Sequence, residues 1–255
     1  MGKWLIAFLI TSIAIPLATA AKIPDHIVLY FNFDKEAGDK VTDRSIYGND
    51  GQINGDVEWV DGKHGGAIKL DGSKAVITVP NSDQLKELKP PMSVGMWVQP
   101  LAFPVEWQCV IEMEARPGDR KDGWKVGFHN QNPVFTTYGH KDHFADQIVL
   151  NPDEWVYLVV TTDGKNVNFY LNGDLAQQVP FAGTIDVTQS PGVNIGAEGG
   201  RPGNWYCQVI LDELWVSNKM MSEDEIKAFM EPEQLFPVDP RERLPVTWAE
   251  VKEGK

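Results

Sequence analysis

Positive charge and cysteine are both scarce in this chain of 255 residues. It has 23 Lys and Arg against 36 Asp and Glu, a formal net charge of −13. A protein that binds nucleic acid or an anionic membrane surface needs the opposite balance, so the sequence disfavours both kinds of partner. After the first twenty residues no segment approaches the ~18 consecutive apolar residues of a spanning helix. Neither a G-x-S-x-G motif nor a phosphate-binding Gly loop before a helix occurs.

The N-terminus has the pattern of an export signal. Lys3 supplies a short positive region, residues 4–17 form an apolar run, and Ala18-Thr19-Ala20 matches a cleavage site. We therefore predict a signal peptide over residues 1–20 and a secreted, periplasmic or cell-surface location. An uncleaved membrane anchor is the alternative, although the run is short for a span and contains a proline.

Export also bears on the only two cysteines, Cys109 and Cys207. An even pair in an exported protein predicts a disulfide, and both residues lie in strand-like segments. Two buried free thiols are the alternative.

Strand patterns dominate the rest of the chain. About a dozen short β-branched and aromatic runs are separated by turn residues, and no βαβ spacing is present. Asp71-Gly72 predicts a tight turn between two runs, and Asn172-Gly173 predicts a type I′ hairpin turn. The expected strands include residues 27–33, 67–70, 75–79, 92–98, 109–114, 123–129, 134–138, 155–162, 167–171, 175–179, 193–196 and 207–216. This pattern predicts an all-β fold, an antiparallel two-sheet sandwich.

One helix is expected, near the C-terminus. Ser222 and Glu225 have the spacing of a capping box, and Pro232 ends the helical pattern. We expect a single domain over residues 21–231 and a Pro-rich, charged tail over residues 232–255.

Six segments carry a resemblance to a known family: Leu29-Tyr30-Phe31-Asn32-Phe33-Asp34, Asp43-Arg44-Ser45 with Gly48-Asn49-Asp50-Gly51, residues 65–72, residues 92–98, residues 155–161 with 169–173, and residues 210–216 with 221–226. In this order they resemble the laminin G-like branch of the concanavalin A-like lectin/glucanase jelly rolls, in its bacterial secreted type. The resemblance covers about residues 26 to 230. It implies a jelly-roll sandwich, but this fold hosts lectins, adhesion modules and glycosidases alike.

Glycoside hydrolysis is one candidate activity. Some jelly-roll glycosidases carry carboxylates on alternate residues of one strand, where period 2 points them to one face. Glu112 and Glu114 have that spacing, but Arg116 and Pro117 stand where a third carboxylate is expected. Two acids on a half-solvated strand are the alternative.

A metal site is a second candidate. The resemblance implies one structural Ca²⁺ held by Asp212 and backbone carbonyls, with Asp34 and Asp71 as further ligand candidates. The alternative is that Asp212 accepts hydrogen bonds from backbone amides. His140-x-x-His143 supplies only two of the four ligands that Zn²⁺ needs, so a polar loop is favoured there.

Non-catalytic binding is the function that we expect. The sequence predicts recognition of a glycan or an extracellular protein through rim loops or the concave sheet face, with a glycosidase or a purely structural surface protein as alternatives. Trp97, Trp155 and Trp215 lie in apolar runs and are expected in the core. The candidate ligand-binding residues are Trp124, His129, Tyr138, Arg201, Asn204 and Trp205.

Overall fold

The computed structural model describes residues 22–34, 38–199 and 205–232. The predicted signal peptide and nearly all of the predicted tail lie outside these residues, as do Arg201 and Asn204. Within these ranges no helix is long and apolar enough to cross a membrane.

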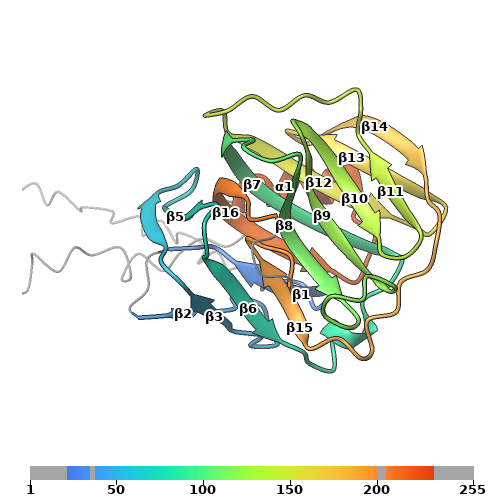
Figure 1. Ribbon diagram of the computed structural model, residues 1–255, viewed down its shortest axis with the longest axis horizontal. Helices are drawn as coiled ribbons and strands as arrows, with labels where there is room; N and C mark the ends of the chain where they lie inside the picture. The colour runs from blue at the N-terminus through green and yellow to red at the C-terminus, as the bar shows by residue number, and fades with distance from the viewer. Residues whose placement is uncertain (1–21, 35–37, 200–204, 233–255) are drawn as a thin grey trace, which may run out of the picture.

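Two antiparallel sheets form the molecule, as the strand pattern predicted, and Figure 1 shows them as two layers. The first sheet has the order β14-β13-β12-β7-β16-β5-β4, and β1 also pairs with β16. Its strands are β1 (Ile27–Phe31), β4 (Glu58–Asp61), β5 (Gly66–Asp71), β7 (Met92–Ala102), β12 (Val156–Thr162), β13 (Asn166–Leu171), β14 (Asp174–Pro180) and β16 (Gln208–Ser217).

The second sheet has the order β11-β10-β9-β8-β15-β6-β3-β2. Its strands are β2 (Lys40–Val41), β3 (Gly51–Asn54), β6 (Val76–Pro80), β8 (Trp107–Glu114), β9 (Gly123–His129), β10 (Asn132–Thr137), β11 (Lys141–Phe144) and β15 (Gly192–Ile195). A 3₁₀ turn over Leu85–Glu87 joins β6 to β7. The chain therefore passes between the sheets several times, which is the jelly-roll arrangement.

The two predicted tight turns have different outcomes. Asn172 and Gly173 both have positive φ and join β13 to β14 as a hairpin, which confirms the type I′ prediction. The turn predicted at Asp71-Gly72 is present, with positive φ at Gly72 and hydrogen bonds from Ser73 to Asp71. It does not close a hairpin, because β5 pairs within the first sheet and β6 within the second. A tight turn reverses the chain, but it does not decide whether the next strand joins the same sheet.

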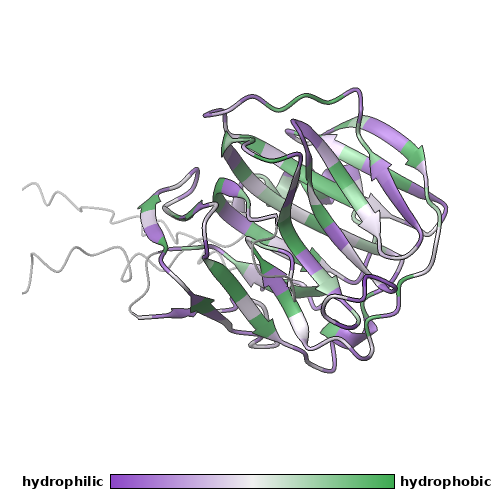
Figure 2. Ribbon diagram, viewed as in Figure 1, coloured by the Kyte–Doolittle hydropathy of each residue, from purple (hydrophilic) through white to green (hydrophobic). Residues whose placement is uncertain are grey.

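The main core lies between the sheets. Apolar residues at alternate positions point inward from both, for example Ile111 and Met113 on β8 and Leu211 on β16. In Figure 2, hydrophilic residues interrupt these hydrophobic strands, as a sheet with one buried face requires.

A second apolar cluster covers the outer face of the first sheet. Here α1 (Glu223–Phe229) packs its Phe229 ring 5.4 Å from the ring of Trp215. Ser222 and Glu225 form the capping box that the sequence predicted. Trp97 and Trp215 are buried in this cluster and Trp155 packs against it, as expected. One outer face of the sandwich is therefore occupied by the protein's own helix.

Candidate ligand-binding face

The outer face of the second sheet carries several polar and aromatic side chains that lie close together. Along β9, Trp124, Val126 and Phe128 point into the core, so Lys125 and His129 point outward. On β8 the register shifts between Cys109 and Ile111. A shift of this kind changes which residues share a face, and it places Trp107 on the same side as Glu112.

Four rings form what we call the aromatic cluster on this face: Trp107, His129, Phe144 and Trp205. The ring centroids of Trp107 lie 4.5 Å from His129, 5.9 Å from Phe144 and 5.8 Å from Trp205. Phe144 is 37% exposed and the other three are half-buried. Trp107 and His129 are cross-strand partners, so the pairing of β8 with β9 holds two of the rings together.

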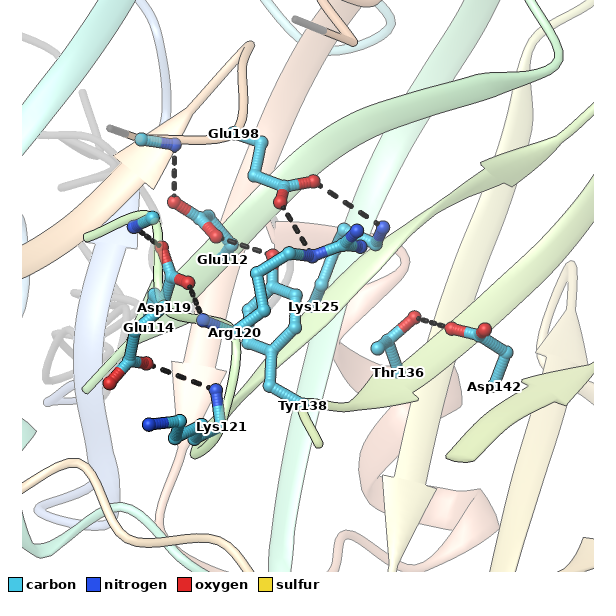
Figure 3. A network of polar contacts seen from close by, with 12 residues as sticks. Glu112, Glu114, Asp119, Arg120, Lys121, Lys125, Thr136, Tyr138, Asp142 and Glu198 are labelled. Atoms are coloured by element: carbon cyan, nitrogen blue, oxygen red, sulfur yellow. Dashed lines mark hydrogen bonds and ion pairs between the residues drawn. The ribbon is translucent and has the colours of Figure 1, made fainter. Parts of the chain in front are cut away.

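Beside these rings lies a group of charges that we call the ion cluster, made of Arg120, Lys125 and Glu198. One carboxylate oxygen of Glu198 is 3.0 Å from Arg120 Nε and the other is 3.8 Å from Lys125 Nζ. Figure 3 shows both cationic side chains converging on Glu198. The side chains of Lys125 and Glu198 have no exposed surface.

The two clusters touch through Trp205. The Arg120 guanidinium carbon lies 4.4 Å from the centroid of the Trp205 ring, and Lys125 Nζ lies 4.6 Å from it. Lys125 Nζ is also 5.1 Å from the ring of Trp107. These are cation–π distances, and they strengthen when water is excluded. The charges therefore position the Trp205 ring.

Glu112 is a buried carboxylate at the edge of the ion cluster. It accepts hydrogen bonds from Tyr138 Oη at 2.5 Å, the Gly199 amide at 2.6 Å and Asn194 Nδ2 at 2.9 Å. Burial raises the pKa of Glu112 to about 7, although the hydrogen bonds from Tyr138, Gly199 and Asn194 oppose this rise.

Glu114, the other predicted catalytic carboxylate, holds a loop. It accepts hydrogen bonds from the backbone amides of Gly118 at 2.7 Å and Arg120 at 2.5 Å. Glu112 and Glu114 are both almost completely buried. The structure thus brings the two acids to one strand as predicted, but both bond to protein groups and neither is presented to solvent.

The structure places the residues that were predicted to bind a ligand in different environments. His129 and Trp205 belong to the aromatic cluster, while Tyr138 is buried against Glu112. The prediction for Trp124 is wrong, because this side chain has no exposed surface and packs in the main core. Strand alternation shows that neighbours face opposite ways, but it does not tell which of Trp124 and Lys125 points outward.

Several residues of this face were not predicted from the sequence: Trp107, Phe144, Arg120, Lys125 and Glu198. Trp107 begins a strand directly before an apolar run, which suggests a core residue. Only the register shift in β8 shows that it faces outward. Lys125 and Glu198 are 73 positions apart in the sequence, so nothing in the sequence links them.

Two of the three predicted metal-binding residues, Asp212 and Asp34, lie close together. Asp212 is buried and its Oδ2 accepts a hydrogen bond from the His64 amide at 2.8 Å, while Oδ1 has no hydrogen-bond partner among the described residues. Asp34 accepts from the Gly66 amide at 3.0 Å and lies near enough to raise the pKa of Asp212. Burial is the larger cause, and together they raise that pKa to about 8.

Asp71 lies apart from this pair. It is five residues along β5 from Gly66, about 17 Å in an extended strand, and it accepts hydrogen bonds from Ser73 instead. Across the described ranges no group of three or more His, Cys, Asp or Glu side chains is placed to hold a metal. Any cation between Asp34 and Asp212 therefore needs backbone carbonyls as further ligands.

His140 and His143 form no metal pair. The His143 ring bonds to the Phe135 carbonyl and accepts from the Ala182 amide at 2.9 Å, whereas His140 contacts Thr184. The polar-loop interpretation matches this arrangement for His140, and His143 is buried.

The predicted disulfide is not formed in the structure, where Cys109 and Cys207 are both buried free thiols. Cys109 pairs with Tyr206 in a β-bridge, so Cys207 is one residue out of step and points to the opposite face, into the main core. Burial raises the pKa of the Cys207 thiol to about 12.

This architecture defines an antiparallel jelly-roll sandwich in which α1 covers the outer face of the first sheet and not that of the second. A family profile described as the concanavalin A-like lectin/glucanases superfamily (Laminin_G_3) matches residues 71–227, more than half of the chain. The chain belongs to this family, which confirms the resemblance that the sequence showed. No curated protein sequence matches it significantly.

Solved structures show the same fold at low sequence identity. Domain 4 of AbnA, a GH43 extracellular arabinanase from Geobacillus stearothermophilus in complex with arabinotriose, has a TM-score of 0.62 and 16% identity. That match covers 83% of this chain and 99% of the domain. The receptor-binding domain of botulinum neurotoxin mosaic serotype C/D has a TM-score of 0.64 and 18% identity, covering 83% of this chain and 52% of that one.

The binding domain of botulinum neurotoxin DC in complex with rat synaptotagmin II has a TM-score of 0.61 and 15% identity. The match covers 82% of this chain and 52% of that domain. This chain thus spans about half the length of the toxin binding domains that it matches.

Proposed function

We propose that this protein is an exported, non-catalytic binding module that recognises carbohydrate through the aromatic cluster. The observation that carries the proposal is the position of four rings, part-exposed, on the outer sheet face that α1 does not occupy. Ligand sites are lined mainly by aromatic side chains with a few placed polar groups. The ion cluster supplies such groups next to Trp205.

Two of the similar structures support a binding role. The arabinanase domain was solved in complex with arabinotriose and one toxin domain in complex with rat synaptotagmin II. Carbohydrate is favoured here because half-exposed rings beside hydrogen-bonding charges suit the mixed apolar and hydroxyl surface of a sugar. Export is proposed from the N-terminal sequence pattern.

A glycan array with the wild type and two variants tests this function. We expect Trp107→Ala to abolish glycan binding, because it removes the ring that contacts the other three. Trp59→Ala is the matched control, since this half-buried Trp lies on β4 of the other sheet. If the wild type binds no glycan, the carbohydrate proposal is wrong, and an extracellular protein ligand or a purely structural role replaces it.

Glycoside hydrolysis by Glu112 and Glu114 is the alternative. The pKa of Glu112 is suitable for a general acid at neutral pH, but its three hydrogen bonds go to protein donors. We expect no turnover of β-glucans; turnover that Glu112→Gln removes would replace the binding proposal with an enzyme.

We also propose that Asp212 and Asp34 hold one structural Ca²⁺. The donor set fits, because Asp212 Oδ1 is buried and lacks a hydrogen-bond partner within the described part of the chain. Two neighbouring carboxylates and the carbonyls of a Gly-rich hairpin are ligands of the kind that Ca²⁺ prefers.

A further inference from the structure

The outer face is hollowed next to the ion cluster. This β9–β11 hollow has a volume of about 290 Å³, and its lining includes Arg120, Thr136, His140, Lys141 and Asp142. Thr136 is the cross-strand partner of both Lys125 and Asp142, so the hollow lies on the same face as the clusters. Arg120 lines the hollow and also lies over the Trp205 ring, which makes the hollow and the aromatic cluster one continuous surface.

The charges around this surface are of both signs. The ion cluster has two cations and one carboxylate, and Glu112 lies at its edge. Glu106 contacts His129 of the aromatic cluster at 2.9 Å. At the hollow, Lys141 stands beside Asp142, whose carboxylate already accepts from Thr136 at 2.6 Å. Binding of an anion here therefore depends on the local donors of Arg120 and not on a net positive charge of the surface.

Two cationic groups retain unused hydrogen-bonding capacity. Lys125 Nζ is buried and has no hydrogen-bond partner in the described residues; its nearest carboxylate oxygen is 3.8 Å away. Arg120 contacts Glu198 through Nε, and its Nη groups make no hydrogen bond to any residue described here. A guanidinium presents parallel N–H donors that match a carboxylate or a sulfate.

We propose that the β9–β11 hollow binds an anionic group, a carboxylate or a sulfate, of the same glycan that lies on the aromatic cluster. The ligand class is thus an acidic oligosaccharide, with the anion at Arg120 and a neighbouring ring at Trp107 and Trp205. This inference rests on the carbohydrate binding proposed above and narrows it.

Titration calorimetry with three trisaccharides tests this inference: one is built of galactose, one of galacturonate and one of sulfated galactose. We expect at least one acidic sugar to bind about tenfold more tightly than the neutral one, because a charge-assisted pair adds about 1.4 kcal/mol or more. The preference should shrink at high salt. The two acidic probes separate a carboxylate ligand from a sulfate ligand.

Matched variants identify the residues that cause the preference for acidic sugars. Arg120→Met should reduce the preference to about twofold or less, and Arg116→Met should keep it. Arg116 loses the same charge, but it bonds to Gln189 and lies outside the hollow. Because Arg120→Met leaves buried Glu198 without its closer partner, Lys141→Met serves as a second variant at the exposed rim; it should weaken the preference without disturbing the fold.

Different failures have different meanings. Equal binding of neutral and acidic sugars, lost in Trp107→Ala, overturns the acidic ligand and leaves the carbohydrate function standing. A preference that survives both Arg120→Met and Lys141→Met also overturns it. Binding of none of the three sugars rejects the acidic ligand, and the glycan array then decides the wider proposal separately.

Discussion

Glu112 shows how a single buried carboxyl links this face to the stability of the fold. Its pKa rises from an ordinary value of 4.5 to about 7, chiefly through burial. Because the raised pKa belongs to the folded state, the folded protein binds this proton more tightly than the unfolded chain does. The stabilisation is complete below pH 4.5 and is lost as the pH rises towards about 7.

We therefore expect Glu112→Gln to be less sensitive to pH than the wild type. Between pH 4.5 and 7 the wild type should lose up to about 3 kcal/mol more of its unfolding free energy than the variant. Urea unfolding at a series of pH values measures this difference. The exposed Glu58→Gln should behave as the wild type. Parallel curves for the wild type and Glu112→Gln would show that Glu112 does not titrate in this range.

The cysteines give a second prediction for single residues. The chain should contain two free thiols that react with a thiol reagent only after denaturation, because both are buried and their pKa values are raised by burial. A count of zero under denaturing, non-reducing conditions would restore the disulfide that the sequence predicted.

At the scale of the element, β7 packs closely against Trp215 on β16. A Cβ atom on Gly95 would lie 2.2 Å from the Trp215 indole, too close for any side chain. Glycine at this position is therefore required by the neighbouring ring and not by the backbone conformation.

Gly95→Ala should lower the unfolding free energy by about 2 kcal/mol, the usual effect of overpacking a core. Adding Trp215→Phe makes room for the new methyl group, so the double variant should be more stable than the sum of the two single changes predicts. Denaturant unfolding of the four proteins measures this coupling. Simple additivity would mean that the two residues do not compete for space.

The N-terminal cap of α1 gives a second prediction at the scale of the element. Ser222→Ala removes the side chain that accepts from the Glu225 amide, which should reduce the unfolding free energy by about 1 kcal/mol. Ser73→Ala, in an exposed loop, is a suitable control.

Individual strands and turns could be predicted from the sequence better than the strands with which they pair. The strand runs, the Asn172-Gly173 turn and the capping box depend on local chemistry, which the sequence contains. The change of sheet after Asp71-Gly72, the burial of Trp124 and the free thiol of Cys109 could not be predicted in this way. Each depends on which sheet or face a residue joins, and that is decided by contacts with distant strands and by the register shift in β8.

The candidate site was predictable only in outline for the same reason. His129 and Trp205 could be selected as aromatic residues with polar neighbours. Trp107 and the ion cluster could not, because burial of a Lys beside a Glu is normally unfavourable. The burial of Lys125 beside Glu198 is offset only because the fold also brings Arg120 and two indole rings next to these charges.

At the scale of the whole molecule, Asp212 and Asp34 connect three parts of the first sheet: the end of β1, the β4–β5 hairpin and the centre of β16. A cation at this point would hold segments that are far apart in the sequence. Without it, the raised pKa of Asp212 makes the fold less stable as the pH rises from 3.8 to about 8.

Calcium should therefore raise the melting temperature at neutral pH. At a Ca²⁺ concentration of about a hundred times its dissociation constant, the stabilisation should be about 2.7 kcal/mol. Asp212→Asn should remove the shift, while Asp71→Asn, at the far end of β5, should keep it. The absence of a shift in the wild type would reject the metal proposal.

The packing of α1 on the first sheet has a consequence for any shortened form of the protein. A fragment that stops at Ser217 keeps every strand but loses Ile226 and Phe229, and with them the cover over Trp97, Tyr157 and Trp215. Such a bared aromatic surface invites self-association. Trimming by proteases within residues 218–229 is thus expected to yield aggregates, even though the outer face of the second sheet would be unchanged.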